Sequence, residues 1–166
     1  IRQDLGIRTS FVVGMVASFA ERKDYATFME AINLMENKTE NLTFLCVGDG
    51  NYLPFQQMLK PSVVDKVLFL DHQEDVVSIM GICDIGVLTT ITEGISNSLL
   101  EFMAMGKPVV VAGGGGCVEL VENGMNGFLL ESGDSNGVCS KINELLDDDG
   151  MRLEFGKKSK KIVENN

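Results

Sequence analysis

Two carboxylates and a polar helix start stand close together in residues 92–110 of this 166-residue chain. Glu93 precedes the polar segment 96–98, and Glu101 follows it inside a helix pattern whose other residues are mostly apolar. Carboxylates accept hydrogen bonds but donate none, so this pair suits the hydroxyl groups of a ligand and repels phosphate. A salt-bridged or solvent-facing glutamate is the simpler alternative for Glu101.

The start of this helix predicts a site for an anion. Ser96 or Asn97 is a good N-cap, because its side-chain oxygen can accept a hydrogen bond from an amide of the first turn. The free first-turn amides and the helix dipole together attract an anion, typically a phosphate. Glu101 follows about 6 to 7 Å along the axis, at roughly 1.5 Å per residue, and Glu93 lies on the other side of the amides. A nucleotide sugar has the matching shape, since its diphosphate lies between a ribose and a second sugar.

The composition limits the class of protein. With 166 residues and 45% hydrophobic content, the chain is long enough for one packed domain over residues 1–166. No apolar run approaches the roughly 18 residues of a membrane-spanning helix, and no signal-peptide pattern opens the chain. A net charge of −10 argues against a nucleic-acid partner, and it requires any phosphate site to be locally positive. The polar residues 1–10 run directly into an apolar strand pattern, which predicts that the chain begins at a boundary between two domains.

The cysteines indicate a reducing compartment. They form no C-x-x-C pair and fall mostly in apolar segments, which is typical of reduced thiols in the core of a cytoplasmic protein. We therefore expect a cytoplasmic protein whose membrane association is weak or absent, with the full-length protein at the inner face of the membrane as an option. The four residues are Cys46, Cys83, Cys117 and Cys139.

Short apolar runs alternate with helical patterns along the whole chain. Because each run is almost entirely apolar, the strands are expected in a parallel sheet that is covered on both faces. The sequence therefore predicts an α/β fold, a Rossmann-like three-layer sandwich with a central parallel sheet of about six strands. The expected strands are 11–17, 42–47, 67–70, 85–88, 109–112 and 128–130; the expected helices are one capped by Asp24 and those at 52–59, 75–80, 97–105, 117–122, 135–146 and 151–163.

Ligands of such sheets bind beyond the carboxyl ends of the strands, so the loops that follow strands are the informative ones. Lys23, after the first strand, could neutralise a diphosphate as a point charge, and a solvated lysine is the alternative. Residues 48–50 hold only half of a dinucleotide fingerprint and predict a tight turn. The glycines 113–116 lack the G-K-[ST] of a Walker loop; they allow close approach to a ligand or simply a flexible turn.

Three further features are interpreted as surface structure. His72, the only histidine, has no evident nucleophile partner and is expected in a surface loop. Residues 147–149 resemble a metal-binding D-x-D, but a solvated acidic turn is favoured. The lysines near the C-terminus predict a solvated helix face with weak membrane attraction as a minor alternative; they are Lys157, Lys158, Lys160 and Lys161.

Together these residues resemble a known family. The segment EGISNSLLEFMAMGKPVV, followed by GCVELVENGMNGFLL, resembles the C-terminal, donor-binding domain of family 4 retaining glycosyltransferases, which have the GT-B fold. That family carries two glutamates separated by seven residues, matched here by Glu93 and Glu101. Supporting matches are VGMVASFAERKDY, FLCVGDG, VLFLDHQEDV and CDIGVL, so the resemblance covers essentially the whole chain in the right order.

The resemblance implies a role for each matching position. Glu93 would hold hydroxyls of the donor sugar close to the reacting centre, and Glu101 would accept hydrogen bonds from the ribose. Amides at the helix start would hold the diphosphate together with Lys23, and the base would lie against the loop after Leu70. The implied donor-binding set is Lys23, Leu70, Gly94, Ile95, Ser96, Asn97, Ser98 and Glu101, with Glu93 as the catalytic residue. Two positions depart from the family: Ser18 replaces a frequent arginine, for which Arg22 is a candidate substitute, and Asp71 replaces a frequent glycine.

The resemblance also implies an activity. The expected enzyme is a hexosyltransferase-like glycosyltransferase that moves a sugar from a UDP- or GDP-sugar to an acceptor hydroxyl with retention of configuration, in polysaccharide or glycoconjugate synthesis. No metal or other cofactor is expected. An acceptor glycan or glycolipid would bind through an N-terminal domain absent from this chain, so the fragment alone is expected to be inactive. A sugar-nucleotide epimerase-like enzyme and a non-catalytic nucleotide-binding module are the alternatives.

Overall fold

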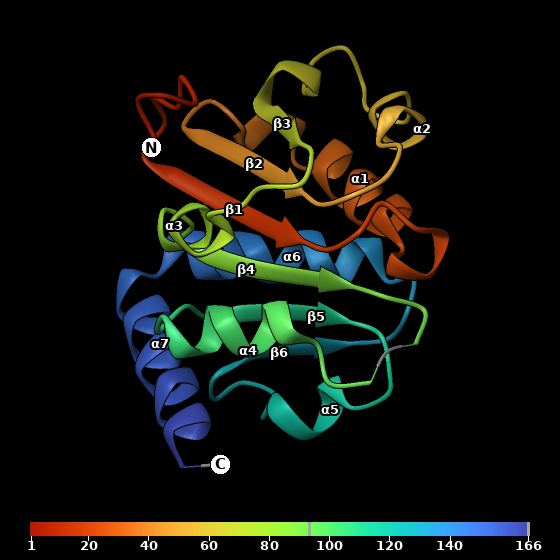
Figure 1. Cartoon of the computed structure of the whole chain (residues 1–166). Coiled ribbons are helices and arrows are strands. Elements are labelled where there is room, and N and C mark those ends of the chain that lie inside the picture. The colour runs from red at the N-terminus through yellow and green to blue at the C-terminus, as the bar shows by residue number, and fades with distance from the viewer. Residues whose placement is uncertain (93, 166) are drawn as a thin grey trace.

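The computed structural model describes residues 1–92 and 94–165, which form one parallel six-stranded sheet with helices on both faces (Figure 1). The strands follow the spatial order β3-β2-β1-β4-β5-β6, so the direction of winding reverses between β1 and β4. This architecture confirms the predicted α/β Rossmann-like fold. The strands are β1 (Phe11–Val16), β2 (Leu42–Val47), β3 (Val67–Leu70), β4 (Ile85–Thr89), β5 (Val109–Ala112) and β6 (Gly127–Leu130).

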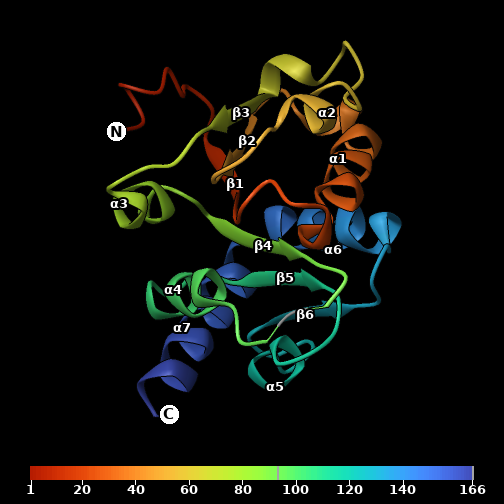
Figure 2. The ribbon, with the colours of Figure 1, turned by 45° about the vertical axis from the view of Figure 1, so that its right-hand side comes forward.

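The helices form the two outer layers (Figure 2). Helices α1 and α6 pack together on one face of the sheet, whereas α4 packs against α7 and α3 on the other face. The α-helices are α1 (Tyr25–Leu34), α2 (Leu53–Gln56), α3 (Val76–Gly81), α4 (Asn97–Ala104), α5 (Cys117–Leu120), α6 (Ser135–Asp147) and α7 (Asp149–Glu164); the short 3-10 helices are η1 (Glu21–Lys23), η2 (Glu36–Lys38) and η3 (Val64–Lys66).

Several boundaries differ from the expected ones by one or two residues, and two helices differ in ways that their hydrogen bonds explain. Helix α2 ends at Gln56, because the amides of Met58 and Leu59 bond three residues back, to the carbonyls of Phe55 and Gln56, which continues the chain as turns. Helix α7 begins earlier than expected, because the Asp148 carboxylate accepts a hydrogen bond from Met151 N–H at 2.8 Å and caps it. The acidic run at 147–149 is therefore mainly a helix-capping segment.

Two paired glycines let α4 approach the sheet closely. Gly14 of β1 and Gly86 of β4 are register partners. A Cβ atom at Gly86 would lie 2.6 Å from the ring of Phe102, and one at Gly14 would lie 2.5 Å from the Cys83 Sγ. Phe102 is almost fully buried, so its ring fills the space that the absent side chains leave. This contact fixes the depth of α4 on the sheet and therefore the position of its N-terminus.

Replacing Gly86 with alanine is expected to lower the free energy of unfolding by about 1–3 kcal/mol, because the new methyl group overpacks the contact with Phe102. Gly81→Ala in α3 is the matched control, since a Cβ there would meet nothing within 4 Å. Urea denaturation of both variants measures the difference. Equal midpoints for the two variants would contradict the close-packing account.

The cysteines lie mostly in the core, as the sequence predicts. Cys46, Cys83 and Cys117 are buried and Cys139 is half-buried, and none of the four forms a disulfide bond. Burial raises the pKa of the Cys83 thiol to about 12, and it raises the pKa of the Cys46 thiol further still. These thiols are therefore protonated and unreactive in the folded protein at neutral pH.

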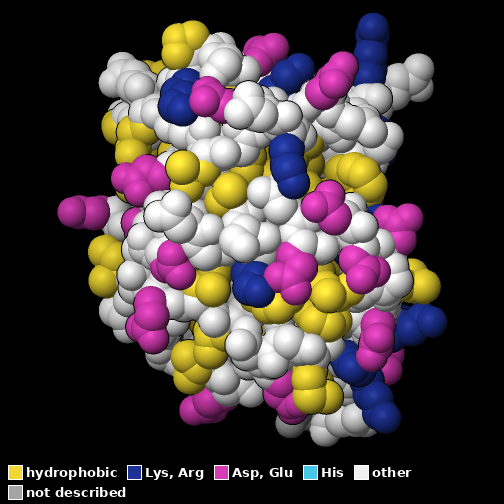
Figure 3. Space-filling view, turned by 180° about the vertical axis from the view of Figure 1, so that it is seen from behind, with side chains coloured by type: hydrophobic (Ala, Val, Ile, Leu, Met, Phe, Trp, Pro, Cys, Tyr) yellow, Lys and Arg dark blue, Asp and Glu magenta, His cyan; other side chains and the backbone are white. Residues whose placement is uncertain are grey.

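Charge is unevenly distributed over the surface. Figure 3 shows acidic side chains spread over the face seen from behind, while basic side chains gather at its lower right, where α7 lies. The lysines of α7 are mostly exposed, as expected for a solvated helix face, and two of them form ion pairs within the helix, Lys158 with Glu154 and Lys160 with Glu164. Within the described residues, none of the helices combines the length and apolar character needed to span a membrane.

Candidate functional site

The loops after β1 and β4 lie at the point where the winding of the sheet reverses, which is where sheets of this kind bind ligands. Hydrogen bonds join the two loops directly. The Arg22 carbonyl accepts from Ile91 N–H at 3.0 Å and from the Thr90 hydroxyl at 3.1 Å. The Thr89 hydroxyl donates to the Lys23 carbonyl at 3.4 Å. The candidate site therefore has a fixed backbone frame.

Lys23 lies inside this frame at the end of η1. Its exposed fraction is only 8%, so the solvated-lysine alternative is wrong. A buried ammonium group is costly unless negative or polar groups surround it, so Lys23 is not a freely solvated surface charge. The Arg22 side chain, by contrast, is exposed, and Ser18 lines a neighbouring cavity.

The start of α4 follows the loop after β4. Ser96 is the N-cap: its hydroxyl accepts from Leu99 N–H at 3.4 Å and is 3.0 Å from the Ser98 hydroxyl. Asn97, the alternative cap, is the first residue of the helix and is exposed. In the part of the chain that the structure describes, the amides of Ile95, Asn97 and Ser98 make no hydrogen bond. They are available to an anion.

Glu101 lies one turn further along α4 and is half-buried. Its carboxylate makes no hydrogen bond or ion pair with any of residues 1–92 and 94–165, so no salt bridge within that range explains it. A partly buried carboxylate without a protein partner suits a ligand that donates hydrogen bonds. Glu93, the predicted catalytic residue, lies outside the described residues, so its role stays a prediction.

A cavity of about 230 Å³ opens beside this frame, at the carboxyl ends of β1 and β2 and under the loop after β3. His72 and Asp49 lie at its edge, with His72 Nδ1 3.3 Å from an Asp49 carboxylate oxygen, and both side chains are mostly exposed. His72 is thus a surface-loop residue, as predicted. The lining residues are Val16, Ala17, Ser18, Val47, Gly48, Asp49, His72, Gln73 and Val76.

The predicted base-binding residue Leu70 is not part of that lining. Its carbonyl accepts a hydrogen bond from Gly48 N–H at 3.1 Å, which ties the ends of β2 and β3 together. Sequence reasoning missed the cavity wall formed by Gln73 and Val76. The sequence held one signal for a close approach at this place, the glycine at position 48 directly after a strand. In the structure a Cβ atom there would clash with the Ala17 carbonyl, and both residues line the cavity.

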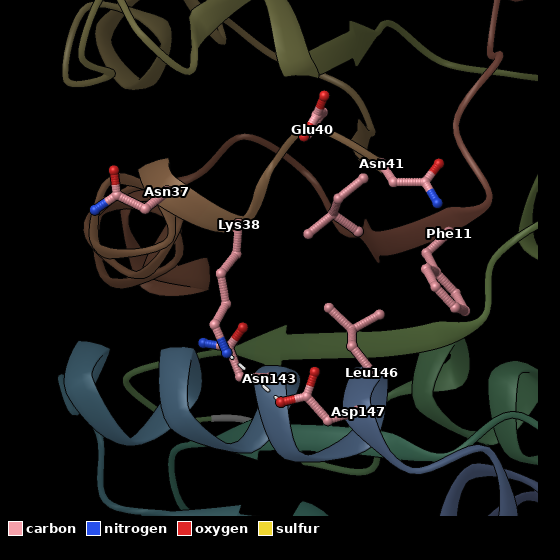
Figure 4. Close-up of a pocket in the computed structure, with 9 residues that line it drawn as sticks. Phe11, Asn37, Lys38, Glu40, Asn41, Asn143, Leu146 and Asp147 are labelled. Carbon is pink, nitrogen blue, oxygen red and sulfur yellow. Dashed lines mark ion pairs between the residues drawn. The ribbon is translucent and has the colours of Figure 1, made fainter.

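A larger pocket of about 360 Å³ lies at the opposite edge of the sheet, where β1 and β2 begin (Figure 4). Lys38 and Asp147 face each other there, with the ammonium nitrogen 3.5 Å from a carboxylate oxygen. We place the candidate site at the carboxyl ends of the strands. The pocket in Figure 4 lies at their amino ends, away from the reversal point, and its one ammonium group, that of Lys38, already forms an ion pair with Asp147. Size alone does not identify a site.

No group of three or more metal-ligating side chains occurs in residues 1–92 and 94–165. Asp147 pairs with Lys38, Asp148 caps α7, and Asp149 pairs with Arg152. These contacts account for the D-x-D run as a structural feature.

The order of the strands, with the direction of winding reversed between β1 and β4, defines a Rossmann-like domain. Comparison with known proteins specifies the family. Residues 10–148 match the model of the family described as "Glycosyl transferases group 1". The chain belongs to this family, which confirms the resemblance drawn from the sequence and favours a transferase over an epimerase-like enzyme.

Several relatives share this region. The chain is 26% identical to the capsular polysaccharide biosynthesis glycosyltransferase CapM of Staphylococcus aureus, over 96% of this chain and 43% of the relative. It is 30% identical to N,N'-diacetylbacillosaminyl-diphospho-undecaprenol alpha-1,3-N-acetylgalactosaminyltransferase of Campylobacter jejuni, over 93% of this chain and 40% of the relative. The crystal structure of Anabaena Alr3699/HepE in complex with UDP and glucose matches with a TM-score of 0.87 and 28% identity, over 99% of this chain and 46% of that chain. The chain thus spans less than half the length of these relatives.

Proposed function

We propose that this chain is the donor-binding domain of a glycosyltransferase and that it binds a nucleotide sugar, with UDP-sugars favoured over GDP-sugars. The observation that carries the proposal is the cluster at the reversal point of the sheet. It comprises buried Lys23, the amides at the start of α4 and the carboxylate of Glu101, and neither the amides nor the carboxylate has a hydrogen-bond partner among residues 1–92 and 94–165. The likeness to a structure that contains UDP and glucose supports a UDP-sugar.

The proposed geometry divides the ligand among these groups. Glu101 accepts hydrogen bonds from the ribose hydroxyls, and the base lies towards the cavity at the ends of β1 and β2. The amides of Ile95, Asn97 and Ser98, together with Lys23, bind the diphosphate. Glu93, by its place before Gly94 in the sequence, binds the transferred sugar.

The proposed reaction breaks the bond between the anomeric carbon and the diphosphate oxygen. The acceptor oxygen forms the new bond to that carbon and passes its proton to the departing diphosphate oxygen, with retention of the anomeric configuration. Negative charge grows on the leaving diphosphate during this step. Lys23 and the fixed amides at the α4 start stabilise that charge without reorganising, which lowers the barrier. We propose that this arrangement needs no bound metal.

We propose that the acceptor is a glycan or glycolipid hydroxyl, as the names of the relatives suggest. Because this chain spans less than half of those relatives, the acceptor would bind mainly to the rest of the protein. The isolated chain should therefore bind the nucleotide but show little turnover. The net charge of −10 disfavours a nucleic-acid partner, and the buried free thiols support a cytoplasmic location.

Calorimetric titration with UDP, GDP and ADP tests the proposal. UDP is expected to bind most tightly, and its affinity should be the same with and without EDTA. If a folded sample binds none of the three, the donor-site assignment is refuted. If binding requires a divalent cation, the metal-free part of the proposal is wrong and the nucleotide site stands.

A further inference from the structure

The glycine-rich turn 113–116 lies directly behind the segment that leads into α4. A Cβ atom at Gly116 would lie 2.9 Å from both the Gly94 carbonyl carbon and the Ile95 nitrogen, and 3.2 Å from the Gly94 oxygen. All three atoms belong to one peptide group, so the Gly116 backbone packs against that peptide. Figures 1 and 2 both show α5, which follows Gly116, beside the entry to α4.

The side chain of Cys117 is hydrogen-bonded to the carbonyl group of the same peptide. This residue is completely buried, and its thiol donates to the Gly94 carbonyl oxygen at 3.7 Å. In a trans peptide the carbonyl and the following N–H point in opposite directions. The N–H of Ile95 therefore points away from Cys117, and within the described residues it has no acceptor. Ile95 itself lies at the surface and is 58% exposed.

We propose that Gly116 and Cys117 are positioning residues that aim the N–H of Ile95 at the terminal phosphate of the bound nucleoside diphosphate. The proposal rests on the proposed function. Glu101, at the far end, would take the ribose, so the peptide at Gly94 and Ile95 lies at the end of the ligand that carries the β-phosphate. Neither positioning residue touches the ligand; both act through the one peptide group they contact.

The size of the residue at position 116 is the critical variable. Gly116 has φ −64° and ψ −16°, a conformation that alanine adopts without strain. An alanine there would act only through its Cβ, which must push the Gly94–Ile95 peptide away. The turn offers a matched control in Gly114, because a Cβ at that position would meet nothing within 4 Å.

The test compares the binding of UDP and UMP by calorimetry in the wild type, Gly116→Ala and Gly114→Ala. We expect Gly116→Ala to raise the dissociation constant for UDP about tenfold, which is the cost of one misdirected hydrogen bond to a charged group. The dissociation constant for UMP should stay within about twofold of the wild-type value. Gly114→Ala should bind both nucleotides as the wild type does. The ratio of the two dissociation constants is the decisive readout, because a loss of general stability would weaken UDP and UMP alike.

Cys117 provides a second, independent test should Gly116→Ala fail to fold. Cys117→Ala removes the donor and is expected to weaken UDP but not UMP, and Cys117→Ser, which retains a donor, should recover most of the loss. Unchanged UDP binding in Gly116→Ala or in Cys117→Ala, or equal losses for UDP and UMP, would overturn the inference while leaving the donor site in place. A wild type that binds no nucleotide would instead refute the proposed function.

Discussion

Glu101→Ala is expected to weaken UDP binding by about ten- to a hundredfold while leaving the fold intact. The carboxylate is half-buried and has no partner among the described residues, so its proposed work is to accept hydrogen bonds from the ribose. Hydrogen bonds to charged groups contribute about 1.5–3 kcal/mol, which corresponds to this loss. Alanine is a strong helix former, so α4 should persist.

The ligand itself can report whether Glu101 contacts the ribose. Wild-type protein should bind 2′-deoxy-UDP more weakly than UDP, whereas Glu101→Ala should bind the two about equally. Glu30→Ala, at an exposed position of α1, is the control for the loss of an acidic side chain and should behave as the wild type. If the Glu101 variant still discriminates between the two nucleotides, the ribose assignment is wrong.

Glu93→Ala is expected to weaken binding of the nucleotide sugar and to leave binding of the bare nucleotide unchanged. By its place before the helix start, Glu93 should act on the transferred sugar and not on the diphosphate. UDP should therefore bind to this variant as it does to the wild type. Affinity for the sugar conjugate should fall about tenfold or more, because several hydrogen bonds to one carboxylate are lost together.

The measurement is a paired titration with UDP and with UDP-glucose, UDP-galactose and UDP-N-acetylglucosamine. The conjugate that the wild type binds most tightly is the one to compare between variants. Parallel losses of UDP and of the sugar conjugate in Glu93→Ala would mean that the two glutamates do not divide the ligand as proposed.

The sequence predicted the strands well because burial on both faces leaves a plain signal. The runs at 42–47, 67–70 and 109–112 have the same limits in the structure. Caps were also readable, since Asp24 and Ser96 each accept a hydrogen bond from the backbone of their own helix. Helix α2 was predicted too long, because helical periodicity does not distinguish an α-helix from the turns that follow it.

The candidate site was less accessible to sequence reasoning, because it depends on contacts between distant segments. Lys23 is buried where the segment after β1 is hydrogen-bonded to the end of β4, and the order of the strands does not follow from their alternation with helices. The contact between Gly116 and the Gly94–Ile95 peptide is of the same kind. Sequence indicated a set of glycines that permits close approach, and only the fold shows what approaches.

An NMR titration of isotope-labelled protein with UDP tests the central claim most directly, because it reports each backbone amide separately. The account predicts that the largest shift changes fall on Lys23, Ile95, Asn97 and Ser98. Large changes confined to the pocket in Figure 4, around Lys38 and Asn143, or saturable binding with no change at the start of α4, would contradict it.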